Sequence, residues 1–209
     1  MPQENMKEQN MVKDVIDGLK YVKYFYSLKT MFIFLSIFGL CSYTYTIMFP
    51  IYAKDILHGD SKLLGFIMGF FGFGAISLMK LESMPKPIII VSFLYSICLS
   101  IFAISTIPAL SLFIVIPAGL GLVATFIASN TLFQTISSTE MRSRVISIYT
   151  IVNIGLGPIG CLLAGILTEY IIPQAALLLW CFIMFSASIF LLKNMKRINK
   201  ELKPIIKEL

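Results

Sequence analysis

Two groups of polar residues are candidates for chemistry, and both lie next to or inside apolar stretches. The first is the charged turn TEMRSR at residues 139–144, which contains Glu140, Arg142 and Arg144. The second group consists of neutral polar side chains, namely Tyr43, Tyr45, Asn130, Gln134 and Asn153. Their amides and phenols can hydrogen-bond a ligand or a neighbouring helix, but they do not carry the charge that proton or ion coupling needs.

The residue types that most enzymes use are not arranged for catalysis. The only histidine, His58, lies in a polar connection, and the four cysteines fall inside apolar blocks without metal-ligand spacing. We find no Cys/His or Ser/His/Asp set and no phosphate-binding loop. We therefore expect neither an enzyme nor a bound metal or cofactor. The cysteines are interpreted as small packing residues without a disulfide.

The composition is that of a membrane protein. Of 209 residues, 57% are hydrophobic and 13% are charged, and the mean hydropathy is +0.86. Soluble domains average about 25% charged residues. The apolar residues come in blocks of about 20, the length at which a helix crosses a bilayer. We therefore predict an all-α membrane protein.

Six apolar blocks are each long enough to span, although the second and sixth are near the lower limit of about 17 residues. They cover residues 31–53, 63–79, 88–107, 109–136, 145–168 and 175–192. None has an Asp, Glu, Lys or Arg near its centre, so these residues alone provide no ion-coupling site.

The basic residues predict the orientation. Of the 17 Lys and Arg residues, all but Lys54 and Lys62 fall in the terminal segments or in the second and fourth connections. By the positive-inside rule, both termini and those two connections are cytoplasmic. We predict a multi-pass protein of the cell membrane. The net charge of +6 is thus explained without nucleic acid.

Three regions follow from this pattern. Residues 1–30 are interpreted as a cytoplasmic amphipathic lead-in, residues 31–192 as the transmembrane domain and residues 193–209 as a basic cytoplasmic tail. The alternative for the lead-in is a frayed terminus. Pro204 is expected to interrupt any long helix in the tail.

Small and neutral polar residues leave two alternatives open. A bend is expected at Pro158. The small residues are interpreted as helix-packing positions, although such stripes occur in many bundles. Asn130 and Asn153 must face other helices or a wet cavity, because an amide facing lipid would lack partners. The small residues are Gly65, Gly69 and Gly72 in the second block, and Gly157, Pro158 and Gly160 in the fifth.

Three segments carry a family resemblance. They are DVIDGLKYVKYFYSLKTMF, FPIYAKDILHGDSKLLGFIMGFFGFGA and, most specifically, TEMRSRVISIYTIVNIGLGPIGCLLAGIL. With them, residues 11–192 resemble the C-terminal half, helices seven to twelve, of a major facilitator superfamily transporter. The likeness is to the bacterial macrolide-efflux and enterobactin-exporter branch.

The resemblance implies a half-transporter built from two inverted three-helix repeats, with substrate bound at the membrane midplane between two six-helix halves. It implies secondary antiport that exports a small amphipathic molecule of the drug or siderophore type. Tyr43, Tyr45, Asn130, Gln134 and Asn153 would then line the cavity. Arg142 and Arg144 would lie in a cytoplasmic gate loop, with Glu140 as a local partner.

The chain departs from the pattern in three places. Met1 falls where the central linker of a full transporter would lie, Ser143 replaces the usual glycine of the gate loop, and the connection MKLESMPKP is short. The expected partners are the bilayer, a small-molecule substrate and either a separate six-helix N-terminal half or a second copy. The alternative hypothesis is a non-transporting remnant or a membrane assembly or regulatory partner.

Overall fold

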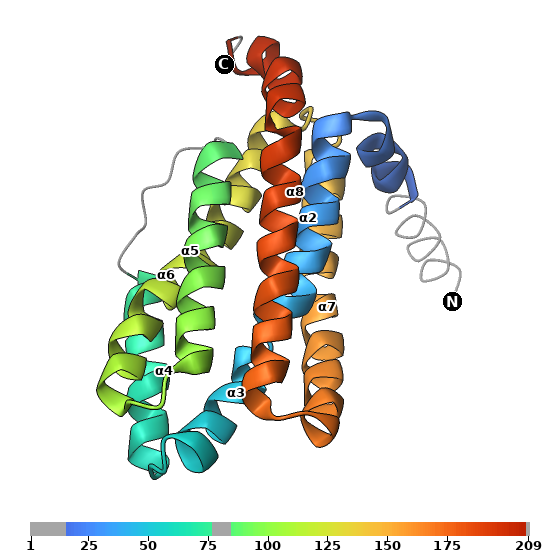
Figure 1. Cartoon of the computed structure of the whole chain (residues 1–209). Coiled ribbons are helices and arrows are strands. Elements are labelled where there is room, and N and C mark those ends of the chain that lie inside the picture. The colour runs from blue at the N-terminus through green and yellow to red at the C-terminus, as the bar shows by residue number, and fades with distance from the viewer. Residues whose placement is uncertain (1–15, 77–84, 208–209) are drawn as a thin grey trace, which may run out of the picture.

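The described part of the chain is helical. The computed structural model describes residues 16–76 and 85–207, and every regular element in these ranges is a helix (Figure 1). A helix at residues 16–24 precedes α2. The others are α2 (Tyr26–Ser42), α3 (Tyr45–Ile51), the π-helix η1 (Tyr52–Ile56), α4 (Ser61–Ile76), α5 (Pro85–Ile104), α6 (Pro108–Ile136), α7 (Arg142–Tyr170) and α8 (Pro173–Lys207).

Five helical segments are long and apolar enough to cross a membrane. They are Tyr26–Ile56, Lys86–Ile104, Pro108–Ile136, Arg142–Tyr170 and Pro173–Leu202. The second predicted span corresponds to α4, an apolar helix of 16 residues. Its predicted end at residues 77–79 lies outside the described residues, as do residues 1–15 of the lead-in and 208–209 of the tail. The count of six spans therefore stays a prediction.

The first span is interrupted near its middle. The α-helical pattern stops at Ser42 and resumes at Tyr45. The Tyr95 hydroxyl of α5 donates a hydrogen bond of 2.7 Å to the Ser42 carbonyl, and Thr44 Oγ1 donates one of 2.7 Å to the Cys41 carbonyl. The break thus has partners for these two backbone acceptors, as a membrane interior requires.

Glycines set the closest helix contacts. A Cβ built on Gly160 of α7 would lie 1.6 Å from the Leu40 carbonyl oxygen of α2, so only glycine fits there. In the same way α4 and α6 meet at Gly74, where a Cβ would lie 1.8 Å from the Ile116 carbonyl oxygen. Close backbone approach through small residues is the usual way in which membrane helices associate.

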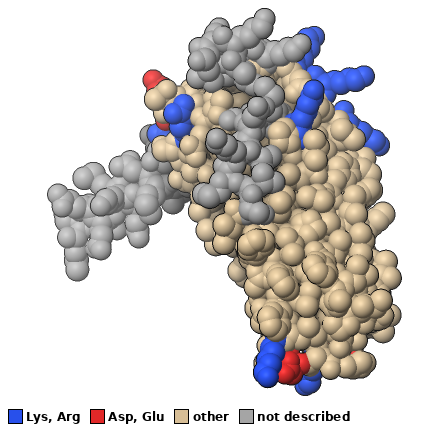
Figure 2. Space-filling model, turned by 90° about the vertical axis from the view of Figure 1, so that its left-hand side faces the viewer, with Lys and Arg blue, Asp and Glu red and all other residues tan. Residues whose placement is uncertain are grey.

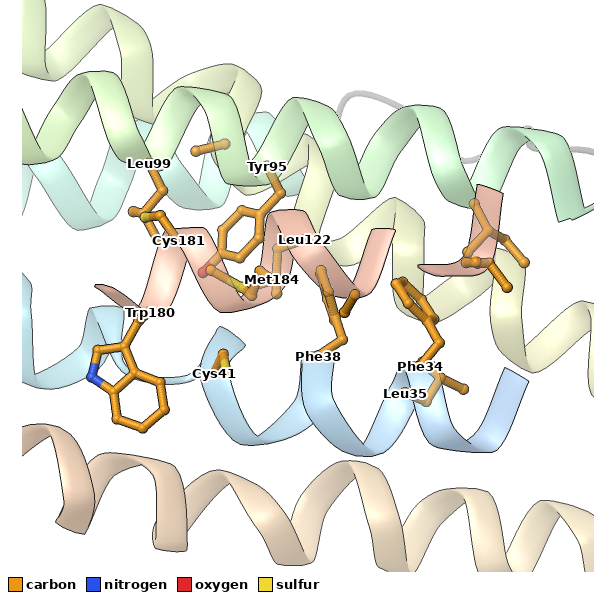
Figure 3. Close-up of a cluster of buried hydrophobic side chains, with 14 of the residues drawn as sticks. Phe34, Leu35, Phe38, Cys41, Tyr95, Leu99, Leu122, Trp180, Cys181 and Met184 are labelled. Atoms are coloured by element: carbon orange, nitrogen blue, oxygen red, sulfur yellow. The ribbon is translucent and has the colours of Figure 1, made fainter. Parts of the chain in front are cut away.

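The core lies where α2, α5, α6 and α8 meet. Figure 3 shows aromatic, aliphatic and sulfur-containing side chains from these four helices packed together. Phe34 and Phe38 of α2, Tyr95 of α5 and Met184 of α8 have no exposed surface. All four cysteines are free thiols, and only Cys161 is not fully buried.

The two ends of the bundle differ in charge. The start of α2, the end of α8 and the turn between α6 and α7 lie at the same end (Figure 1). Lys and Arg side chains gather at that end in Figure 2, while the long flank between the ends carries none. This arrangement agrees with alternating spans, but the side of the membrane that each end faces stays a prediction.

The tail differs from expectation. α8 continues as one helix of 35 residues from Pro173 to Lys207, so the prediction that Pro204 interrupts a long tail helix is wrong. A proline removes one backbone donor from a helix. The bond lost is the one to the carbonyl four residues earlier, and the helix continues past it to Lys207.

Candidate functional site

Tyr43 lines an apolar cavity beside the break in the first span. The cavity has a volume of about 270 Å³, and its other lining residues, all from α7, are Ile154, Gly157, Pro158 and Cys161. Gly157 is required here, because a Cβ on it would lie 2.8 Å from the Tyr43 ring. The cavity therefore offers an aromatic ring and apolar walls, which suit an apolar part of a ligand.

The backbone at Tyr43 is itself hydrogen-bonded. Its carbonyl accepts a hydrogen bond of 2.8 Å from Thr46 Oγ1 and one of 3.3 Å from the Cys161 thiol. The Tyr43 ring stacks on Phe126 of α6, with 6.0 Å between centroids. α3, α6 and α7 therefore all contribute to the position of Tyr43.

Asn153 belongs to a polar contact between α6 and α7. Its Nδ2 donates to the Tyr149 hydroxyl (3.3 Å), which in turn donates to the Phe126 carbonyl (2.9 Å). Asn153 and Tyr149 are four residues apart in α7 and so share one face of the helix. The buried Asn153 Oδ1 has no hydrogen-bond partner among the described residues. Asn153 thus supports the contact with α6 through Tyr149 and retains an unused acceptor.

Asn130 and Gln134 lie one turn apart on α6. Asn130 is half-buried, and its buried Oδ1 has no hydrogen-bond partner among the described residues, while Gln134 is exposed. In a membrane, a buried amide oxygen without a protein partner needs water, a ligand or another protein segment to donate a hydrogen bond to it. The structure brings Tyr43 and Asn153 together through Phe126 and Tyr149, and it places Asn130 one turn beyond Phe126.

Tyr45 lies in a different environment. Its ring contacts Phe71 of α4 at 4.5 Å and Phe49 at 5.2 Å between centroids. It is half-buried in this aromatic cluster. Tyr45 therefore contacts α4, whereas Tyr43 faces α7.

The charged turn is short, and its arginines begin α7. Glu140 and Arg142 are exposed. Arg144 Nη1 lies 3.8 Å from Asp17 Oδ2, which belongs to the helix at residues 16–24. Gly18 of that helix allows the contact, because a Cβ there would lie 2.7 Å from the Ile148 side chain. The lead-in helix is therefore docked on the start of α7.

The predicted packing glycines fall into two sets. Gly160 lies against the Leu40 carbonyl of α2, and Gly157 lies against the ring of Tyr43 in the break that follows α2. By contrast, no described atom lies within 4 Å of a Cβ built on Gly65, Gly69 or Gly72. These three face away from the described helices, so their packing role stays a prediction.

Sequence reasoning missed the packing role of Gly119 and the contribution of Phe126. Gly119 of α6 lies against α4, because a Cβ built on it would be 1.9 Å from the Phe71 carbonyl oxygen. Its lack of a side chain was the available signal. Phe126 gave no signal, because its role depends on its carbonyl and on Tyr43 stacking from a distant segment.

An all-helical bundle with five candidate spans has the architecture of a multi-pass membrane protein. The chain belongs to the transmembrane secretion effector family of the major facilitator superfamily, whose model matches residues 1–206. Membership of this family points to membrane transport rather than to enzyme activity.

Curated relatives agree with this assignment. The chain is 27% identical over 176 residues to the "Multidrug efflux pump Tap" of Mycobacterium tuberculosis and of Mycobacterium bovis. The match covers 80% of this chain and 42% of each relative, so the chain spans about two fifths of their length. No solved structure gives a significant match.

Proposed function

We propose that this chain takes part in secondary-active export of a small amphipathic molecule as the half of a transporter that corresponds to helices seven to twelve. The observation that carries the proposal is the face built from Tyr43, Asn130 and Asn153. It combines an apolar cavity with two buried amide oxygens that have no partner among the described residues. An amphipathic substrate presents the matching chemistry, with an apolar body for the cavity and polar donors for the amides.

The residues of this chain would bind and orient the substrate. Tyr43 supplies a ring that Phe126 and Gly157 hold in place. The two asparagines accept hydrogen bonds in a low-dielectric environment, where such bonds discriminate strongly. Because none of the apolar blocks has an ionisable group near its centre, the coupling groups would come from the other half of the transporter.

Efflux assays with single variants test this role. The full chain is co-expressed with a six-helix N-terminal half in a host that lacks its own efflux pumps, and accumulation of a fluorescent amphipathic dye is measured. Asn153→Leu and Asn130→Leu should each weaken apparent substrate affinity by about tenfold, because one hydrogen bond is lost. Ser186→Ala is the matched control, since its exposed hydroxyl bonds only to the Phe182 carbonyl of its own helix. Unchanged efflux in both asparagine variants would refute the binding role.

A second candidate function is that of a non-transporting assembly or regulatory partner. The outward-facing set Gly65, Gly69 and Gly72 favours it, because an open small-residue face suits docking of another helix. Gly69→Leu should then abolish co-purification with a partner membrane protein without changing dye accumulation. Loss of efflux in the same variant would instead favour the half-transporter.

A further inference from the structure

Residues 191–202 of α8 form two distinct faces. Leu191, Met195, Ile198 and Leu202 are buried against the chain. The exposed cations of this stretch lie within an arc of about 100° on the opposite side, from the helical period of about 3.6 residues. This basic face consists of Lys193, Lys196, Arg197 and Lys200.

The only carboxylate in residues 193–202, that of Glu201, does not lie on the basic face. It accepts hydrogen bonds from the Ser27 amide, at 2.7 Å, and from the Ser27 hydroxyl. About two turns earlier, the Asn194 side chain accepts a hydrogen bond from the Tyr26 hydroxyl. Both side chains therefore face the start of α2, which leaves the outer face of this stretch with positive charge alone.

Arg197 is held in place on the edge of this face. Its guanidinium carbon lies 3.8 Å above the centre of the Tyr26 ring. A cation over an aromatic ring is attracted to the ring's electron-rich face. The arginine is thus positioned by α2, although its side chain remains exposed.

The basic face continues an exposed apolar stripe of the same helix. Phe182, Phe185 and Phe190 are 68%, 37% and 38% exposed and lie on the same side of α8 as the lysines. In a membrane-spanning helix, an exposed apolar stripe of this kind contacts the acyl chains of the lipids. From Lys193 to Lys200 the helix rises about 10 Å, which is comparable to the headgroup layer on one side of a bilayer.

We propose that the basic face of α8 binds the headgroups of anionic phospholipids. Charge complementarity and continuity with the lipid-facing stripe both point to this occupant. A soluble anionic partner would account for the cations but not for their register with the exposed phenylalanines. Each surface lysine or arginine strengthens binding to an anionic bilayer by about fivefold.

Lipid binding to the purified full chain tests the proposal. The protein in neutral-detergent micelles is titrated with phosphatidylglycerol or phosphatidylcholine, and bound lipid is counted by native mass spectrometry. We expect phosphatidylglycerol to bind about tenfold more tightly or better. The triple variant K193Q/K196Q/K200Q should lose this preference. The double variant K54Q/K62Q, which removes the two lysines near the opposite end, should keep it.

Two further measurements separate the alternatives. K193R/K196R/K200R replaces the same three lysines, retains the charge and should retain the preference, which shows that the preference depends on charge. Inorganic phosphate in excess should not displace phosphatidylglycerol, because it lacks the acyl chains that contact the stripe. Equal binding of the two lipids, an unchanged preference in the Gln triple variant, or full displacement by phosphate would each overturn the proposal.

Discussion

Replacing Gly160 with alanine should disrupt the contact between α2 and α7. The built Cβ lies 1.6 Å from the Leu40 carbonyl oxygen, which is backbone and cannot rotate away. Ordinary contact needs about 3.5 Å, so the two helices would have to separate by roughly 2 Å. Forcing an extra group into a packed contact costs about 1–3 kcal/mol.

Two other glycines of α7 provide matched controls. No described atom lies within 4 Å of a Cβ built on Gly155 or Gly165. At these positions alanine should be neutral or stabilising by up to about 1 kcal/mol, because it is the better helix former. The three substitutions are chemically identical and lie in one helix, so differences between them report the local contact.

Unfolding of the full chain in mixed detergent micelles measures the effect. Far-ultraviolet circular dichroism follows helix loss as the fraction of denaturing detergent rises or as temperature increases. For a chain of this size, each kcal/mol corresponds to about 2–4 °C in Tm. Gly160→Ala should therefore unfold several degrees below both controls. If it unfolds together with Gly155→Ala, the close approach of α2 and α7 is refuted.

Three further substitutions test other contacts by the same unfolding assay. Glu201→Gln should destabilise the chain by about 1 kcal/mol, because it weakens the acceptor for the Ser27 amide at the start of α2; an increase in stability would contradict this cap. Tyr95→Phe should cost about 0.6–1.7 kcal/mol, since a buried hydrogen bond at the helix break is lost; no change would show that the carbonyl is satisfied otherwise. Asp17→Asn should change stability by less than about 1 kcal/mol, because both partners of its 3.8 Å pair with Arg144 are about one third exposed; a larger loss would indicate a buried pair.

The long helices were predictable because membrane spans depend on local composition. The apolar blocks at 109–136 and 145–168 match α6 and α7 within a few residues at each end. Prolines mark two of the helix starts, at Pro108 and Pro173, where the missing backbone donor costs least. These signals need no knowledge of what a helix packs against.

The break in the first span was not predictable from its own sequence. Neither proline nor glycine occurs between Ser42 and Tyr45. The Tyr95 hydroxyl that binds the Ser42 carbonyl comes from a helix about 50 residues further along the chain. An interruption supported by a distant side chain leaves no local pattern.

The candidate site was predictable by residue type but not by grouping. Asn153 and Tyr149 have the i, i+4 spacing that places them on one face, so their contact follows from the sequence. The separation of Tyr45 from Tyr43 depends on where α4 and α7 lie. The ion pair of Arg144 with Asp17 likewise depends on the docking of the lead-in helix.

The interruption after Ser42 also bears on how this span can change in length. In a regular helix, inserting or deleting one residue rotates everything beyond it by about 100° and moves each side chain to a new neighbour. At residues 43–44 the regular backbone ladder is replaced by tighter bonds between residues three apart, such as Thr44 N–H to the Cys41 carbonyl, and the hydroxyls of Tyr95 and Thr44 donate two further hydrogen bonds to carbonyls at the break. A change of length is therefore accommodated there at the smallest cost to the packing of α2, which makes these two residues the expected site of insertions and deletions among related chains.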